Sequence, residues 1–266
     1  MTSSESGSDD VVQLERVGVH IVVVTINRPQ ARNAVSSAVT RLLEAHVKAI
    51  EADATIRVAI LTGAGRQAFC AGADLKEMTR GSAGGTRTTE EGGFAGFVFA
   101  PRRKLWIAAV NGAAVAGGFE LVLACDMVIA STQAVFGLPE VKRGLAATAG
   151  GIFRLPRALP RAVALEMIVT GDTMDARRAH ALGLVNHLVA PELVLQEALR
   201  VAETVSRNAP LAVAWSLELA RRAHDFDEAE LRRRARELST RILATEDARE
   251  GPRAFAENRA PLWRGC

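Results

Sequence analysis

The sequence predicts an α/β core with a largely parallel sheet, followed by a helical C-terminal part. In the first 160 residues, β-branched runs at 19–26, 58–62 and 105–110 alternate with segments of helical spacing, of which 36–52 is the clearest. Strands that alternate with helices favour a parallel sheet with crossover connections. After about residue 160 the strand pattern nearly disappears, apart from 184–189. Helices are expected there at 161–169, 175–181, 192–207, 210–224, 227–245 and 249–257.

These patterns divide the chain into three regions. Residues 1–10 are polar and acidic, without the apolar run of a signal peptide, and are expected to form a disordered tail. Residues 11–200 are expected to form the α/β core, and residues 201–266 the helical C-terminal region. Residues 80–93 are rich in Gly, Thr and Ser, which favours a mobile loop that acts as a substrate lid. No apolar run reaches the length of a membrane span, and a cytoplasmic setting is expected.

The composition argues against several functions. The chain has 33 Lys and Arg against 30 Asp and Glu, and a net charge of only +3 argues against nucleic-acid binding. The three cysteines and five histidines are scattered, so neither a disulfide framework nor a metal site is expected. There is no Tyr, which excludes a tyrosyl acid. Gly63 and Gly65 could begin a nicotinamide-binding turn, but Ala68 stands where that motif needs its third glycine.

Three short segments carry residues that could do chemistry. The first, 68–76 (AFCAGADLK), follows a strand and a Gly-rich turn. Its small residues let the backbone approach a ligand closely, and exposed N–H groups there could bind an oxyanion. The same pattern is also common in ordinary strand-to-helix turns.

The second segment, 110–121 (VNGAAVAGGFEL), passes from a strand through Gly117 and Gly118 into an apolar helix that is expected to reach Ala124. N–H groups at a helix N-terminus lack acceptors and lie at the positive end of the helix dipole. Glu120 in the first turn could merely complement that dipole. Because the rest of this helix is apolar, however, the carboxyl group is expected to be buried, and a buried carboxyl suggests function.

The third segment, 136–145 (FGLPEVKRGL), places Glu140 after a turn that contains Pro139. Glu140 could be a solvated loop residue paired with Lys142 or Arg143, or a second carboxyl group of an acid/base pair. The glycines of the stretch 149–151 are expected to allow another close approach of the backbone.

Together these segments resemble the crotonase superfamily, the enoyl-CoA hydratase/isomerase family. The strings 68–74, 109–120 and 136–140 occur in the order and at the separations of that family, and the likeness runs from Asn27 to Arg264. The resemblance implies a crotonase-like spiral of ββα units with a helical C-terminal trimerisation region, and therefore a homotrimer or a dimer of trimers. It also implies an acyl-CoA thioester substrate. No metal and no cofactor are expected, since CoA is itself part of the substrate.

By motif, the resemblance places the acid/base pair at Glu120 and Glu140 and the two oxyanion-hole N–H groups at Ala73 and Gly117. The positions implied for substrate and CoA binding are Ala31, Arg32, Ala71, Asp74, Leu75, Lys76, Gly118 and Phe255, the last from an adjacent subunit. Isomerases of the family typically keep only the second glutamate, whereas this chain has both. The implied reaction is therefore the hydration of trans-2-enoyl-CoA to 3-hydroxyacyl-CoA in fatty-acid β-oxidation or related acyl-CoA catabolism.

Other functions stay open beside hydration. They are double-bond isomerisation, the reaction of a carnitine-derived acyl-CoA, and acyl-CoA or RNA binding without turnover. Trp106 departs from the family pattern, in which a Lys-Pro pair often leads into this strand, and it could reshape the acyl pocket or simply pack. Asn258 stands before Arg259 where relatives commonly have a Lys-Arg pair.

Overall fold

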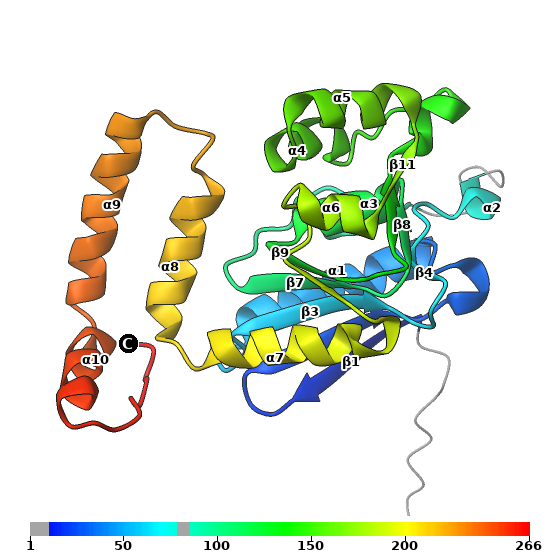
Figure 1. The fold of residues 1–266 in the computed structure, drawn as a ribbon. Helices are drawn as coiled ribbons and strands as arrows, with labels where there is room; N and C mark the ends of the chain where they lie inside the picture. Colours follow the sequence, from blue (N-terminus) through cyan, green and yellow to red (C-terminus); the bar gives the residue numbers. More distant parts are fainter. Residues whose placement is uncertain (1–10, 79–85) are drawn as a thin grey trace, which may run out of the picture.

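The computed structural model describes residues 11–78 and 86–266. The predicted tail at 1–10 and residues 80–85 of the predicted loop lie outside these residues. Within the described part, a large and a smaller sheet form the core, helices cover them, and three C-terminal helices stand to one side (Figure 1). Among the described helices, none combines the length and apolar character needed to cross a membrane.

The large sheet has six strands in the order β1-β2-β3-β7-β9-β12. These strands are β1 (Val12–Val17), β2 (Ile21–Ile26), β3 (Val58–Gly63), β7 (Leu105–Val110), β9 (Met127–Ser131) and β12 (His187–Val189). From β2 to β12 every neighbouring pair is parallel, and only β1 pairs antiparallel, with β2. The predicted parallel sheet with crossover connections is therefore confirmed.

The second sheet repeats a simple unit along the chain. Its strands are β4 (Ala68–Cys70), β8 (Ala113–Val115), β10 (Val135–Gly137) and β11 (Thr173–Asp175), in the order β11-β10-β8-β4. Strands β4, β8 and β10 each follow one strand of the large sheet, and a helical segment follows each pair. These segments are α2 (Leu75–Met78), α3 (Gly117–Ala124) and the 3-10 helix η3 (Pro139–Arg143). The expected spiral of ββα units is thus present, and it brings the ends of three short strands together.

Helix α1 (Ser37–Ala52) shows how local sequence fixes an element. The Ser36 hydroxyl accepts the N–H of Val39 and caps the helix, and Leu43, Val47 and Ile50 are buried on one face. The other helices are α4 (Gly151–Ala158), α5 (Arg161–Thr170), α6 (Ala176–Ala181), α7 (Val194–Ser206), α8 (Pro210–Arg221), α9 (Glu228–Leu243) and α10 (Glu246–Ala256), with 3-10 turns η1 (Pro29–Ala31) and η4 (Pro191–Leu193). A small hairpin of β5 (Thr88–Thr89) and β6 (Gly93–Phe94) occupies part of the predicted loop.

Successive side chains of the central strands face two separate cores. In β2, Val22 and Val24 pack in the core that contains residues of α1 and α3, whereas Ile21 and Val23 pack in the core that contains residues of α7. Both faces of these strands are buried, so they read as continuous apolar runs.

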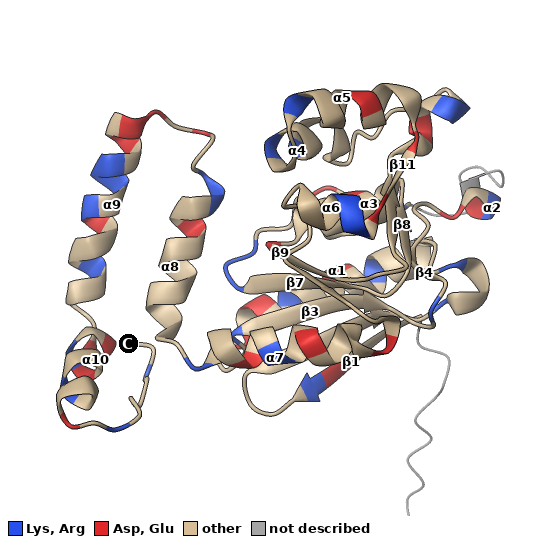
Figure 2. Cartoon of the chain, viewed as in Figure 1, with Lys and Arg blue, Asp and Glu red and all other residues tan. Residues whose placement is uncertain are grey.

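Helices α8, α9 and α10 form a C-terminal arm that stands away from the large sheet (Figure 1). Neither α8 nor α9 has a buried residue. Arg221 of α8 ties the arm to the core through Asp126, with 2.6 Å between Nη2 and Oδ2. Figure 2 shows bands of basic and acidic residues along α9, in contrast to the mostly uncharged strands of the core. The predicted boundary at residue 200 falls within α7, which packs on the sheet.

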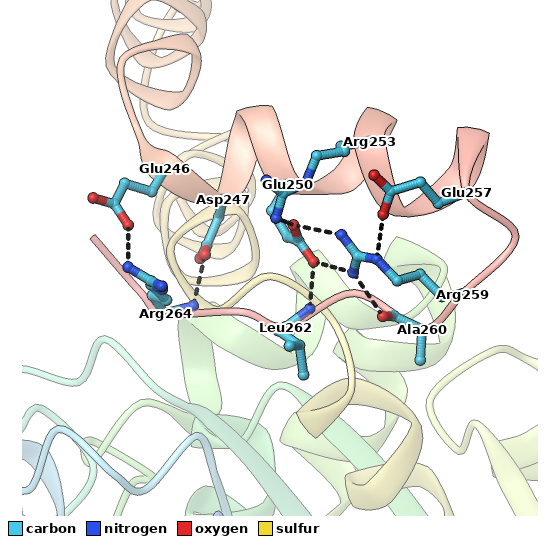
Figure 3. A network of polar contacts seen from close by, with 9 residues as sticks. All are labelled: Glu246, Asp247, Glu250, Arg253, Glu257, Arg259, Ala260, Leu262 and Arg264. Atoms are coloured by element: carbon cyan, nitrogen blue, oxygen red, sulfur yellow. Dashed lines mark hydrogen bonds and ion pairs between the residues drawn. The ribbon is translucent and has the colours of Figure 1, made fainter.

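The last residues of the chain fold back along α10 (Figure 3). The Asp247 carboxylate accepts the N–H groups of Arg264 and Gly265, at 2.7 and 3.0 Å. The Glu250 carboxylate accepts the N–H of Leu262 at 2.8 Å and Nη2 of Arg259 at 3.0 Å. Two acidic side chains on one helix face therefore hold the tail in place.

Candidate active site

A cavity of about 400 Å³ lies where the strands of the second sheet end. The turn after β4, the start of α3, η3 and the segment 145–149 form its walls, together with residues between 88 and 99. The lining residues are Ala71, Ala73, Leu75, Thr88, Phe94, Phe99, Val115, Ala116, Gly117, Glu120, Pro139, Glu140, Arg143, Leu145, Ala146, Thr148 and Ala149. Within residues 11–78 and 86–266, no group of three or more His, Cys, Asp or Glu side chains has an arrangement that could hold a metal ion.

Ala73 and Gly117, the two residues expected to supply main-chain N–H groups, both line this cavity. Ala73 forms a parallel bridge with Val35, in which Val35 itself makes both hydrogen bonds, so the N–H of Ala73 stays unused. Gly117 is the first residue of α3, where an N–H has no acceptor within the helix. In the described part of the chain neither group has a protein acceptor. A Cβ built on Gly72 would lie 3.0 Å from the nitrogen of Gly117, so the two turns are in contact.

Glu120 lies in the first turn of α3 and is only 4% exposed. Its Oε1 accepts the N–H of Gly151, the first residue of α4, at 2.9 Å. Burial raises the pKa of Glu120 to about 7, and the nearby Glu140 acts in the same direction, against the opposing effects of Gly151 and Arg154. A carboxyl group with such a pKa can accept or release a proton near neutral pH.

Glu140 is held by η3, whose first residue is Pro139. The side chain is half-buried, and its Oε2 is buried without a hydrogen-bond partner in the described residues. Burial raises the pKa of Glu140, and the positive charge of Arg143 partly opposes this shift. The two carboxyl groups therefore line the same cavity as the two free N–H groups.

Comparison with known proteins agrees with this arrangement. A sequence profile described as Enoyl-CoA hydratase/isomerase matches residues 17–266. The chain belongs to the enoyl-CoA hydratase/isomerase family. Carnitinyl-CoA dehydratase of Salmonella arizonae is 42% identical over 250 residues, which cover 92% of this chain and 95% of the relative. Enoyl-CoA hydratase EchA19 of Mycobacterium tuberculosis is 38% identical over 272 residues, which cover 98% of each chain.

Solved structures of the family share the whole fold. The crystal structure of enoyl-CoA hydratase EchA1 from Mycobacterium marinum has a TM-score of 0.92 and 43% identity, and the match covers 97% of this chain and 100% of that one. The crotonase-like spiral and its helical C-terminal region, which the sequence predicted, are confirmed.

Two of the positions that the family resemblance implied for substrate binding line the cavity, and the others do not. Ala71 and Leu75 line the cavity beside Ala73. Gly118 does not line the cavity. A Cβ there would be 2.0 Å from the carbonyl oxygen of Cys70, so this glycine allows α3 to pack on β4.

The remaining implied positions do not line the cavity. Ala31 and Arg32 end the turn η1, and the Arg32 carbonyl accepts the N–H of Ala71 at 3.0 Å, which places them next to the cavity wall. Lys76 is exposed on α2. Phe255 is 86% exposed on α10, in the C-terminal arm. The binding roles of all these residues stay predictions.

Asp74 supports the turn that carries Ala73. Its Oδ2 accepts Nη2 of Arg28 at 2.9 Å, and its Oδ1 accepts the N–H of Lys76 at 3.1 Å. The side chains of Arg28 and Asp74 are 18% and 11% exposed. This ion pair therefore joins the turn before α1 to the turn after β4.

Asp74→Asn is expected to lower the free energy of unfolding at pH 7 by about 2 kcal/mol, because the Arg28 guanidinium loses a charged partner. Burial disfavours the Asp74 carboxylate, but Arg28 and the N–H groups of Glu77 and Lys76 together outweigh burial and lower the pKa of Asp74. A lowered pKa stabilises the folded protein above the unfolded value of about 3.9, and this contribution is lost as the pH falls through the folded value. The difference from the wild type should therefore shrink below about pH 4.

Urea unfolding at pH 7 and in acid measures this difference. Asp172→Asn is the matched control, since Asp172 pairs with Lys142 at 2.6 Å but is 72% exposed. It should change stability little. Equal stabilities of the Asp74 variant and the wild type at pH 7 would contradict the prediction.

Some features of the site are not evident from the sequence. The ring of Phe94 covers Gly117, where an added Cβ would meet the ring at 2.5 Å, and Phe99 forms another wall.

The N–H of Gly151 that binds Glu120 lies in the stretch 149–151, for which a close backbone approach was predicted. Trp106 is fully buried, with its ring 5.0 Å from that of Phe97, and it packs in the core.

Proposed function

We propose that this chain is a cytoplasmic enoyl-CoA hydratase, which adds water across the 2,3 double bond of a trans-2-enoyl-CoA to give 3-hydroxyacyl-CoA. The observation that carries the proposal is that the buried Glu120, the half-buried Glu140 and two residues with free main-chain N–H groups line one cavity. The family membership supports a thioester substrate, since relatives include enoyl-CoA hydratases. No metal or organic cofactor takes part in the proposed reaction.

The two N–H groups would bind the thioester oxygen. Water adds at C3 only if the negative charge that develops on this oxygen is stabilised. Fixed donors such as those of Ala73 and Gly117 do this with little reorganisation, and one donor contributes ~3–4 kcal/mol to the transition state. The dipole of α3 acts in the same direction at Gly117.

The two glutamates would then handle the protons. We expect a water molecule between them, with Glu120 accepting its proton as oxygen bonds to C3, and Glu140 delivering a proton to C2. Two close carboxyl groups resist double ionisation, so the pair shares at least one proton. The raised pKa values of both side chains support this.

The proposed assembly is a homotrimer or a dimer of trimers. Large apolar side chains of the C-terminal arm are exposed: Leu243 is 70%, Leu262 75% and Phe255 86% exposed. Exposed apolar side chains gathered on one part of a protein indicate an interface. Phe255 would then reach the CoA of an adjacent subunit.

Crotonyl-CoA tests the proposed function directly. Hydration removes the conjugated double bond, so the absorbance of the thioester should fall with time. A deconjugating isomerase would give a shifted alkene without the 3-hydroxy product, and an acyl-CoA or RNA binding protein would give no turnover. Mass spectrometry of the product separates these outcomes, and the absence of the 3-hydroxyacyl product would refute the proposal.

Arg143 favours an acyl group without positive charge. It is the only basic side chain among the described residues of the cavity wall, and its Nη1 donates to the carbonyl oxygen of Pro139 at 3.4 Å. A carnitine-derived acyl group carries a quaternary ammonium, which Arg143 would repel. Crotonyl-CoA is therefore expected to have a kcat/KM at least about tenfold above that of crotonobetainyl-CoA.

Arg143→Gln should bring the two kcat/KM values closer together, because it should raise the value for crotonobetainyl-CoA. Lys142→Gln is the control, because Lys142 pairs with Asp172 and does not line the cavity. It should leave the ratio unchanged. A wild-type preference for crotonobetainyl-CoA would show instead that the chain shares the activity named for its carnitinyl-CoA dehydratase relatives.

A further inference from the structure

Arg154 is a half-buried cation on α4 that lies behind the cavity wall. Its Nη2 donates to the carbonyl oxygen of Val98 at 2.6 Å, while its Nη1 is buried without a hydrogen-bond partner in the described residues. Val98 precedes Phe99, a residue of the cavity wall. Arg154 therefore fastens α4 to the segment that closes one side of the cavity.

Two aromatic rings and a glycine determine the position of the Arg154 guanidinium. The guanidinium carbon is 5.3 Å from the ring centre of Phe99 and 5.6 Å from that of Phe153, and these rings stack. Gly150 has a φ of +119°, and a Cβ there would be 2.6 Å from Nη1. The backbone thus leaves room for the guanidinium only because residue 150 is glycine.

The same helix also holds Glu120. Gly151, one turn before Arg154, donates its N–H to Glu120 Oε1 at 2.9 Å. The charged or titratable groups that act on Glu120 are Glu140 from η3, which disfavours its ionisation, and Arg154, which favours it. Those that act on Arg154 are Glu120, Cys125, Arg157 and Arg102.

We propose that Arg154 is a positioning residue for the hydration reaction, whose half-buried charge keeps Glu120 in the ionised form that accepts the proton of water. This inference rests on the proposed function. Burial and Glu140 both oppose ionisation of Glu120, whereas the main-chain N–H groups of Gly151 and Ala149 and the charge of Arg154 favour it. Arg154 adds its charge from beside Gly150, next to the N–H that binds Glu120, and it does not line the cavity.

The test is the dependence of kcat/KM for crotonyl-CoA on pH, which reports groups of the free enzyme. Glu120 must be ionised, so the wild-type rate should rise with pH through about 7. Arg154→Gln and Arg154→Met remove the charge, and the Met variant keeps an unbranched apolar side chain beside the two stacked rings. Both should move the rising limb to higher pH by about one unit. Arg154→Lys keeps the charge and should leave the limb in place.

Arg157→Gln is the matched control. It removes a positive charge from the same helix, but Arg157 is 51% exposed and pairs with Asp225 at 3.6 Å. The rising limb of the pH profile of Arg157→Gln should therefore coincide with that of the wild type. The proposal is overturned if the rising limb of the pH profile stays in place in both neutral Arg154 variants and kcat/KM falls by the same factor at every pH. That result would show a structural role only. Absence of crotonyl-CoA hydration by the wild type would instead refute the proposed function, and with it this role.

Discussion

Glu140→Gln is expected to abolish the hydration of crotonyl-CoA, with kcat reduced by about 10³-fold. The amide keeps the size of the side chain, but it cannot deliver a proton to C2. Glu120→Gln should cost nearly as much, because an amide cannot accept a proton from water. Neither change alters the main-chain N–H groups of Ala73 and Gly117, which are proposed to bind the thioester, so KM should change much less than kcat. Initial rates of absorbance loss measure both parameters.

Glu166→Gln is the control for these two variants. Glu166 lies on α5, is 63% exposed and is 3.8 Å from Arg178, so its loss should leave the rate unchanged. The double variant of Glu120 and Glu140 should be little worse than either single variant, because groups that act as a unit are not additive. Turnover at the wild-type rate in either single variant would end the assignment of the pair.

The core elements could be predicted because their sequence signals do not depend on distant contacts. The strand at 105–110 and the helix from Gly117 to Ala124 have the predicted bounds, since one is a continuous apolar run and the other starts at a glycine pair. Strand β1 was missed because it is an edge strand whose side chains from Gln13 to Arg16 are exposed. Helix α4 was missed because it contains Pro156 and begins at the second of two consecutive glycines, which are signals of a turn.

Some features of the site could be predicted from the sequence and others could not. The motifs that contain Glu120 and Glu140 predicted two carboxyl groups, and the structure places both on one cavity. The support from Arg154 could not be predicted, because its contact with Val98 joins residues 56 positions apart. Asp74 shows the reverse case. Its carboxylate is engaged by Arg28, a partner that the local sequence does not indicate, and the substrate contact that the family resemblance implied for it stays a prediction.

Gly72→Ala is expected to lower kcat/KM for crotonyl-CoA by about 10²–10³-fold. Gly72 has a φ of +88°, and a Cβ there would lie 2.9 Å from the Cβ of Ala116 and 3.0 Å from the nitrogen of Gly117. Relief of this overlap must move the turn of Ala73 away from the start of α3. The two N–H groups would then no longer meet at one thioester oxygen, and one donor would be lost to the transition state.

Gly183→Ala separates this displacement from backbone strain. Gly183 follows α6 with a φ of +86°, and a Cβ there would meet nothing within 4 Å. An alanine in this conformation costs about 1–2 kcal/mol at either position, so both variants should lose thermal stability. Only the Gly72 variant should also lose rate, because only there does the new methyl group press on Gly117. Equal kcat/KM values in the two variants would mean that the turn of Ala73 does not position a donor for the thioester oxygen.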